Sequence, residues 1–204
     1  MESRKLVLWG ARAALLGGAM AALVGLLTVL NPEYWRYEAP VDYTVLFVEG
    51  VALVAVTGAL TGLHLRHSPQ YGRLGSISFY TALIGTLVAG AAHIIAIPFL
   101  VFLSTGSLVY VLIGPSQGIV LVGGLAYVLG ALCMSVGYLL LGAAVLRARV
   151  LPLWCGPALV LGLVGHWTLG NLWGWVVFGL AWAAIGHALR HSGEANNERP
   201  VRVV

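Results

Sequence analysis

Five polar residues that could carry chemistry lie within or at the ends of long apolar stretches of this sequence: Glu49, His93, Tyr127, His166 and Asn171. Glu49 is the only acidic residue inside any such stretch. Ionisable side chains are costly within a bilayer and commonly mark ion or proton pathways. A carboxyl group and imidazoles can accept a proton or bind a small cation. The five residues are therefore a candidate ligand or proton pocket.

Glu49 and His93 allow two interpretations. In the first, Glu49 accepts a proton or binds a cation, and His93 is its hydrogen-bond partner. In the second, the two side chains satisfy each other inside a helical bundle and only fix the register of the helices. Depth along the chain places both in the outer half of the bilayer, together with His166. Any pocket that they form is therefore expected to open outward.

The histidines raise the possibility of a metal or a haem. His93 and His166 could be metal ligands, or axial ligands of haem b, if their helices face each other at similar depth. No cofactor is favoured, because depth is the only feature that relates the two residues. We expect no histidine pair at the short spacing within one helix that HExxH motifs supply. The four other histidines are interpreted as interfacial residues beside arginines: His64, His67, His187 and His191.

The composition indicates a membrane protein. Only 9% of the 204 residues are charged, 60% are hydrophobic, and the mean hydropathy is +0.93. Soluble domains carry about 25% charged residues, because water must wet their surface. The pI of about 9.3 would also suit a nucleic-acid binder, but the basic residues lie at the ends of apolar stretches, so no nucleic acid is expected as a partner. The chain contains no Walker loop, which argues against the nucleotide-hydrolysing enzymes that use it.

Apolar stretches of spanning length predict an all-α transmembrane bundle with six crossings. The expected helices cover about 6–30, 43–65, 75–103, 117–146, 151–167 and 170–190. Residues 192–204 are expected to form a polar cytoplasmic tail. Pro98 is expected to kink the third of these helices.

Basic residues predict the orientation of the bundle. Ten of the eleven should share one side of the membrane: Arg4, Lys5, Arg12, Arg66, Arg73, Arg147, Arg149, Arg190, Arg199 and Arg202. Short basic loops remain cytoplasmic, so both termini are expected inside, in the cytoplasmic (inner) membrane. Arg73 and Arg147 then require an even number of crossings between them. Two crossings fit, which leaves 106–118 as an interfacial loop or a re-entrant segment.

Small residues recur at helical spacing on two of the expected helices: Gly17, Ala21 and Gly25 on the first, and Gly123, Gly130 and Gly137 on the fourth. Such residues let helix backbones approach closely in lipid. Besides the lipid bilayer, the expected partners are therefore another membrane protein or a second copy of the chain, bound through these helices.

Residues 139–165 contain a sequence pattern that is similar to one in a known group of proteins. Arg147 and Ala148 end a predicted helix, and Leu151, Pro152, Trp154 and Gly156 follow. This pattern resembles an Arg-Ser/Ala-x-x-Leu/Ile-Pro-x-Trp signature of a group of uncharacterised bacterial multi-spanning membrane proteins. Leu153 stands where that group usually has a basic residue, so the match is partial. The resemblance implies a helix, a short loop and a second helix, and it implies no activity.

Three classes of function follow from these observations. The first is a non-enzymatic bundle that senses, scaffolds or accompanies a partner. The second is a carrier for a small ion or an apolar small molecule that uses Glu49 and His93. The third is a haem-binding or other redox subunit that uses His93 and His166. We rank them in this order, which leans away from an enzyme.

Overall fold

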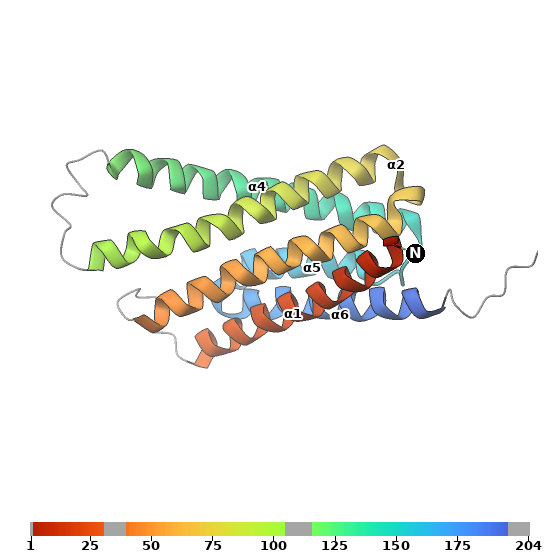
Figure 1. The fold of residues 1–204 in the computed structure, drawn as a ribbon, viewed down its shortest axis with the longest axis horizontal. Coiled ribbons are helices and arrows are strands. Elements are labelled where there is room, and N and C mark those ends of the chain that lie inside the picture. The colour runs from red at the N-terminus through yellow and green to blue at the C-terminus, as the bar shows by residue number, and fades with distance from the viewer. Residues whose placement is uncertain (1, 31–39, 105–115, 196–204) are drawn as a thin grey trace, which may run out of the picture.

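The computed structural model describes residues 2–30, 40–104 and 116–195, and all of its regular elements there are helices. They are α1 (Glu2–Leu30), α2 (Pro40–Ser104), α4 (Ser116–Ala148), α5 (Cys155–Thr168) and α6 (Gly170–Ala195). Figure 1 shows them lying nearly side by side along the long axis of the molecule. The expectation of an all-α bundle is confirmed.

Helix α2 reverses direction at Gly72, whose φ of 61° and ψ of −156° are not helical. This conformation is open almost only to glycine. The bend divides α2 into a first arm, residues 40–71, and a second arm, residues 73–104, which lie against each other (Figure 1). The two arms correspond to the separate helices expected at 43–65 and 75–103. The backbone stays helical through Pro98, and Gly72 is the position with non-helical angles inside α2.

Six helical rods therefore form a closed ring in chain order. The contacts run from α1 to the first arm, on to the second arm, α4, α5 and α6, and from α6 back to α1. Glycines make each contact close, because a side chain would collide with the next helix. A Cβ on Gly18 would lie 2.6 Å from the carbonyl oxygen of Gly179, and one on Gly85 would lie 2.1 Å from the backbone nitrogen of Met134.

The small-residue faces of α1 and α4 are used within the chain. Gly17 packs on Ala52, Gly25 packs on Val176, and Gly137 packs on Ala82. In lipid, close backbone approach of this kind supplies the dispersion contacts that hold helices together. The spacing of these glycines therefore reflects packing inside one bundle. A partner that bound through the same faces would have to displace these contacts within the chain.

Within the described residues, three stretches are long and apolar enough to cross a membrane, which supports a membrane protein: Arg4–Leu30, Thr44–Ile95 and Leu125–Ala148. They are fewer than the six crossings expected. Part of the difference is that both arms of α2 fall within the single stretch Thr44–Ile95. Another part is that α5 has only 14 residues, about 21 Å at 1.5 Å per residue.

Some expected boundaries were wrong. Helix α5 begins at Cys155 and not near 151, so Pro152 precedes the helix and does not lie in its first turn; its carbonyl accepts a hydrogen bond from the Cys155 N–H at 3.0 Å. Helix α6 continues to Ala195, four residues into the expected polar tail. Residues 196–204 and most of the expected outer loop at 106–118 lie outside the described residues.

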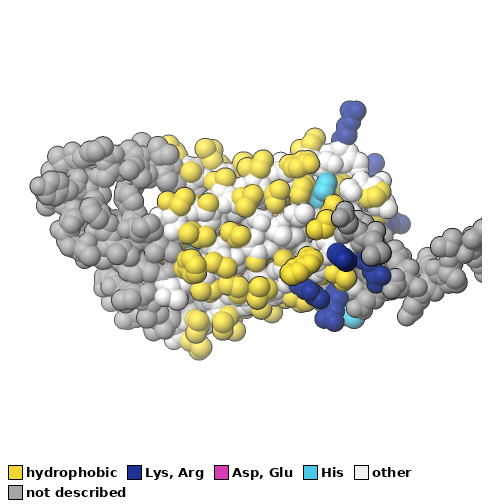
Figure 2. Space-filling view, in the orientation of Figure 1, with side chains coloured by type: hydrophobic (Ala, Val, Ile, Leu, Met, Phe, Trp, Pro, Cys, Tyr) yellow, Lys and Arg dark blue, Asp and Glu magenta, His cyan; other side chains and the backbone are white. Residues whose placement is uncertain are grey.

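The basic side chains gather at one end of the bundle, the end that holds the N-terminus (Figure 2). The order of the rods explains why. Residues 4–12 begin α1, residues 66 and 73 flank the bend of α2, residue 147 ends α4, and residue 190 is near the end of α6. In a ring of alternating direction these positions share one end. Arg36, Arg199 and Arg202 are outside the described residues.

Candidate functional site

Glu49 lies on the first arm of α2 and is only 2% exposed. The adjacent Gly50 lets the second arm approach, since a Cβ there would lie 2.6 Å from the Ile94 side chain. This close approach brings His93 on the second arm opposite Glu49. The distance from His93 Nε2 to Glu49 Oε2 is 3.6 Å. That is an ion-pair distance and is too long for a direct hydrogen bond.

The orientation of the His93 ring is fixed by its own helix. Nδ1 lies 2.8 Å from the carbonyl oxygen of Ala89, one turn earlier. A carbonyl only accepts hydrogen bonds, so Nδ1 carries the hydrogen. In a neutral His93, Nε2 therefore has no hydrogen and carries a free lone pair. Nε2 is also the atom that faces Glu49. The pair can consequently share one proton between Nε2 and the carboxyl group.

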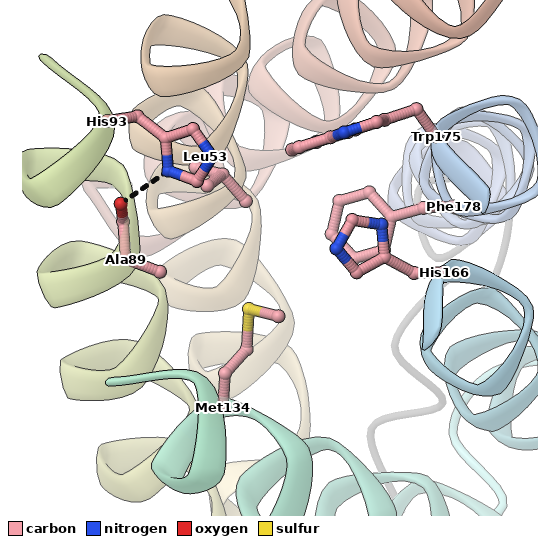
Figure 3. Close-up of a pocket in the computed structure, with 7 residues that line it drawn as sticks. All are labelled: Leu53, Ala89, His93, Met134, His166, Trp175 and Phe178. Carbon is pink, nitrogen blue, oxygen red and sulfur yellow. Dashed lines mark hydrogen bonds between the residues drawn. The ribbon is translucent and has the colours of Figure 1, made fainter. Parts of the chain in front are cut away.

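A small cavity lies at the centre of the ring, next to this pair. Its volume is about 10 Å³, close to the space that one water molecule needs. Its lining comes from both arms of α2 and from α4, α5 and α6 (Figure 3): Leu53, Ala89, His93, Met134, His166, Trp175 and Phe178. His93 and His166 thus border the same space from α2 and α5.

Aromatic rings hold the two imidazoles in place. The Trp175 ring lies 4.8 Å from the His166 ring and 6.2 Å from the His93 ring, measured between centroids, and both contacts are edge-to-face. Tyr127 makes a similar contact with His93 at 5.5 Å. Edge-to-face contacts of this kind add about 0.5–1.5 kcal/mol each to area burial between aromatic rings.

Two polar atoms of the site have no partner among the described residues. They are Oε1 of Glu49 and Nδ1 of His166. Buried polar atoms are costly unless they are hydrogen-bonded, and a polar group left alone in a native interior usually marks a missing water, ion or functional role. If Glu49 and His93 only satisfied each other's hydrogen-bonding needs, Oε1 of Glu49 would not be left without a partner among the described residues. The arrangement therefore favours a site that takes up a proton or a water molecule.

The structure brings several of the predicted polar residues together. Glu49 and His93 meet, and His93 and His166 line one cavity. Tyr127 contacts His93 from the rim and is 36% exposed. Asn171 is in the first turn of α6, and its side-chain environment lies outside the described residues.

The sequence search missed the apolar half of the site. Met134, Trp175 and Phe178 complete the lining, and a search for polar residues in apolar stretches passes over them. One signal in the sequence could have found Trp175. It lies four residues after Asn171, and residues at this spacing share a face of a helix.

A metal or a haem does not fit the internal site around His93 and His166 well. They contain no group of three His, Cys, Asp or Glu side chains that could hold a metal ion. The space between His93 and His166, about 10 Å³, matches one water molecule and is far too small for a porphyrin. The described site therefore gives the haem b alternative no structural support.

The interpretation of the other histidines needs two corrections. His67 is buried, with Nδ1 donating to the Leu63 carbonyl oxygen at 2.8 Å, and it stacks on Tyr71, so it packs inside the bundle. Nearby, His64 hydrogen-bonds the Tyr71 hydroxyl and stacks on Phe79. The second correction concerns spacing. His187 and His191 are four residues apart on α6 with ring centroids 4.3 Å apart, so a pair at ligand spacing does exist.

Comparison of the chain with known protein families, with curated proteins and with solved structures finds no match in any of the three. The site itself is therefore the basis for inferring a function.

Proposed function

We propose that this chain is a multi-pass membrane protein that carries protons, with Glu49 as the residue that takes up the proton and His93 as its transfer partner. The observation that carries the proposal is Oε1 of Glu49, which has no hydrogen-bond partner among the described residues, on a side chain only 2% exposed and facing a histidine across 3.6 Å. Intramembrane carboxyl–imidazole arrangements are the usual components of proton relays.

The proposed relay has three groups and one water molecule. A proton on the Glu49 carboxyl passes to the lone pair of His93 Nε2, which leaves a carboxylate beside an imidazolium. The imidazolium then returns the proton, or passes it to a water in the cavity, and the water donates to the lone pair of His166 Nδ1. Each step moves one proton between two heteroatoms. His93 links the steps, because it faces Glu49 across 3.6 Å and lines the same cavity as His166.

A proton suits the site better than a larger solute does. The cavity volume of about 10 Å³ leaves space for about one water and excludes an apolar small molecule in this conformation. A metal cation bound by Glu49 and His93 would need further ligands, and the cavity has space for only about one water to supply them. Of the small ions that a carrier of this kind could transport, we therefore propose the proton.

We further propose six crossings with both termini in the cytoplasm, in the cytoplasmic membrane. The collection of basic side chains at one end supports this orientation through the positive-inside rule. Six rods in a closed ring support the number of crossings. The resemblance of 147–156 to bacterial multi-spanning proteins supports the choice of membrane. In this orientation Glu49, His93 and His166 are nearer the outer surface.

A second candidate is the non-enzymatic sensing or accessory bundle. Its support is the tight interior, in which the buried side chains of the middle of the bundle, such as Leu60, Tyr138 and Trp182, are at most 1% exposed. In that case Glu49 would bind a proton without passing it through the bundle. Binding and passage can be measured separately, so the two candidates can be distinguished.

The test is proton flux in liposomes that contain the full chain. A pH gradient is imposed, valinomycin and potassium balance the charge, and an internal pH-sensitive dye reports the decay of the gradient. We expect the wild-type protein to speed this decay and Glu49→Gln to return it to the rate of protein-free liposomes. Glu38→Gln is the matched control, because Glu38 lies in the acidic segment between predicted crossings and should not affect the flux.

Proton uptake after a pH jump in detergent is the companion measurement. Uptake that depends on Glu49, without flux, would support the sensing bundle and contradict the carrier. Equal flux for wild type and Glu49→Gln would also contradict the carrier. Circular dichroism of both proteins ensures that a lost flux is not a lost fold.

A further inference from the structure

His187 and His191 lie on one exposed face of α6, near the basic end of the bundle. The opposite side of this turn is firmly packed. Ile185 and Leu189 are fully buried, and Gly186 lies so close to α1 that a Cβ would be 2.9 Å from the carbonyl oxygen of Ala11. The packing fixes the rotation of α6, so both imidazoles are held at the surface.

The two rings are already close enough for one ligand to reach both. Their centroids are 4.3 Å apart and their planes are inclined by 68°. Two nitrogens bound to one tetrahedral zinc ion at ~2.1 Å lie roughly 3.4 Å apart. Small side-chain rotations reach this geometry from the observed one. Histidines at positions i and i+4 of a helix are also the pair that HExxH sites use.

We propose that His187 and His191 form a surface site for a divalent transition-metal ion of the zinc, copper or nickel class, with both imidazoles as ligands and water completing the coordination. Imidazole is a preferred ligand of these three ions. The rigid helix lowers the entropy cost of binding, because the two side chains need little further ordering. This site is separate from Glu49 and His93 and does not depend on the proposed proton transport.

Arg190 lies between the two histidines and contributes a like charge. Its side chain is exposed, so water and salt screen its repulsion of a bound cation. The repulsion weakens the site without removing either ligand. Replacing Arg190 by glutamine should therefore leave the affinity unchanged or raise it, which provides a matched control one residue away from a ligand.

The experiment is calorimetric titration of Zn²⁺ into the full chain, purified in detergent without a polyhistidine tag and stripped with a chelator. We expect one ion per chain. His187→Gln and His191→Gln should each weaken binding by at least roughly tenfold, because even loss of a group that only supports a metal ligand costs 10–100-fold. Arg190→Gln should not weaken it.

Titration with Cu²⁺ adds a spectroscopic readout. Electron paramagnetic resonance of the wild-type protein should show nitrogen ligands that are lost in the His187→Gln/His191→Gln double variant. The proposal is wrong if the wild type and the double variant bind Zn²⁺ equally, or if neither binds. Binding that instead disappears in His93→Gln would assign the ion to the internal site and would likewise overturn it.

Discussion

His93 Nε2 faces Glu49 Oε2 across 3.6 Å, and the two residues belong to opposite arms of the same bent helix. The Ala89 carbonyl holds the other ring nitrogen, so the free lone pair can point only toward the carboxyl group. The bend at Gly72 thus has a consequence about 30 Å away at 1.5 Å per residue, because it sets the register in which the two arms meet.

The Glu49–His93 contact should appear as an energetic coupling. We expect the single variants Glu49→Gln and His93→Gln and their double variant to give a coupling of about 0.5–3 kcal/mol, as residues in contact do. Unfolding in mixed detergent micelles, followed by fluorescence of the seven tryptophans, measures it. Glu49→Gln with Ser78→Ala should be additive, since Ser78 is 15 residues from His93, about 22 Å along the arm. A coupling of zero for the first pair would contradict the contact.

Gly137 should be intolerant of a methyl group. A Cβ there would lie 2.2 Å from the backbone nitrogen of Ala82, and backbone cannot move aside cheaply. We expect Gly137→Ala to lower the free energy of unfolding by about 1–3 kcal/mol, the usual cost of overpacking. Gly58→Ala is the control, because its Cβ would meet only the Ala13 side chain at 3.1 Å. Equal stability of the two variants would argue against the close α2–α4 contact.

Substitution of Gly72 tests the effect of backbone conformation on stability, separately from side-chain collisions. A Cβ there would meet nothing within 4 Å, so any effect of Gly72→Ala comes from the strained φ and ψ. We expect a loss of about 1–3 kcal/mol in unfolding free energy. Arg73→Ala, at the neighbouring position, should change stability little. A neutral Gly72→Ala would show that the bend adopts another conformation.

Replacing Arg149 by glycine should stabilise the protein. Arg149 has a positive φ of 52° just after α4, and its N–H donates to the Val145 carbonyl oxygen at 3.3 Å. Glycine takes this left-handed conformation without strain, so Arg149→Gly should raise the unfolding free energy by roughly 1 kcal/mol. Arg147→Gly, in the last turn of α4, should have the opposite sign, with a loss of roughly 1 kcal/mol. The same sign for both variants would contradict the assignment.

Cysteine labelling should report the proposed topology. Starting from Cys133→Ala/Cys155→Ala, single cysteines replace Lys5, Arg73 or Arg149 at the basic end and Arg36 in the acidic segment. An impermeant maleimide added to intact cells should label only the Arg36→Cys protein. The three others should react after the membrane is permeabilised. Labelling of Arg73→Cys from outside would exclude two crossings between residues 73 and 147.

The sequence by itself determined the class of the protein and the polar residues worth testing. Scarce charge and long apolar stretches indicate a membrane helix bundle, because lipid offers backbone groups no hydrogen-bond partners and a helix satisfies them within one stretch. The same scarcity made Glu49 and His93 conspicuous. Depth could also be estimated from the sequence, because the rise per residue of a helix is constant.

Only the tertiary structure decided which of these residues meet. Contact across a bundle depends on the rotation of each helix, and no linear pattern of mostly apolar residues fixes that rotation. The close glycine contacts fix it here, so Glu49 reaches His93 and a cavity of about 10 Å³ joins His93 to His166. They also turned His67 inward and His187 outward, two placements that interfacial composition could not separate.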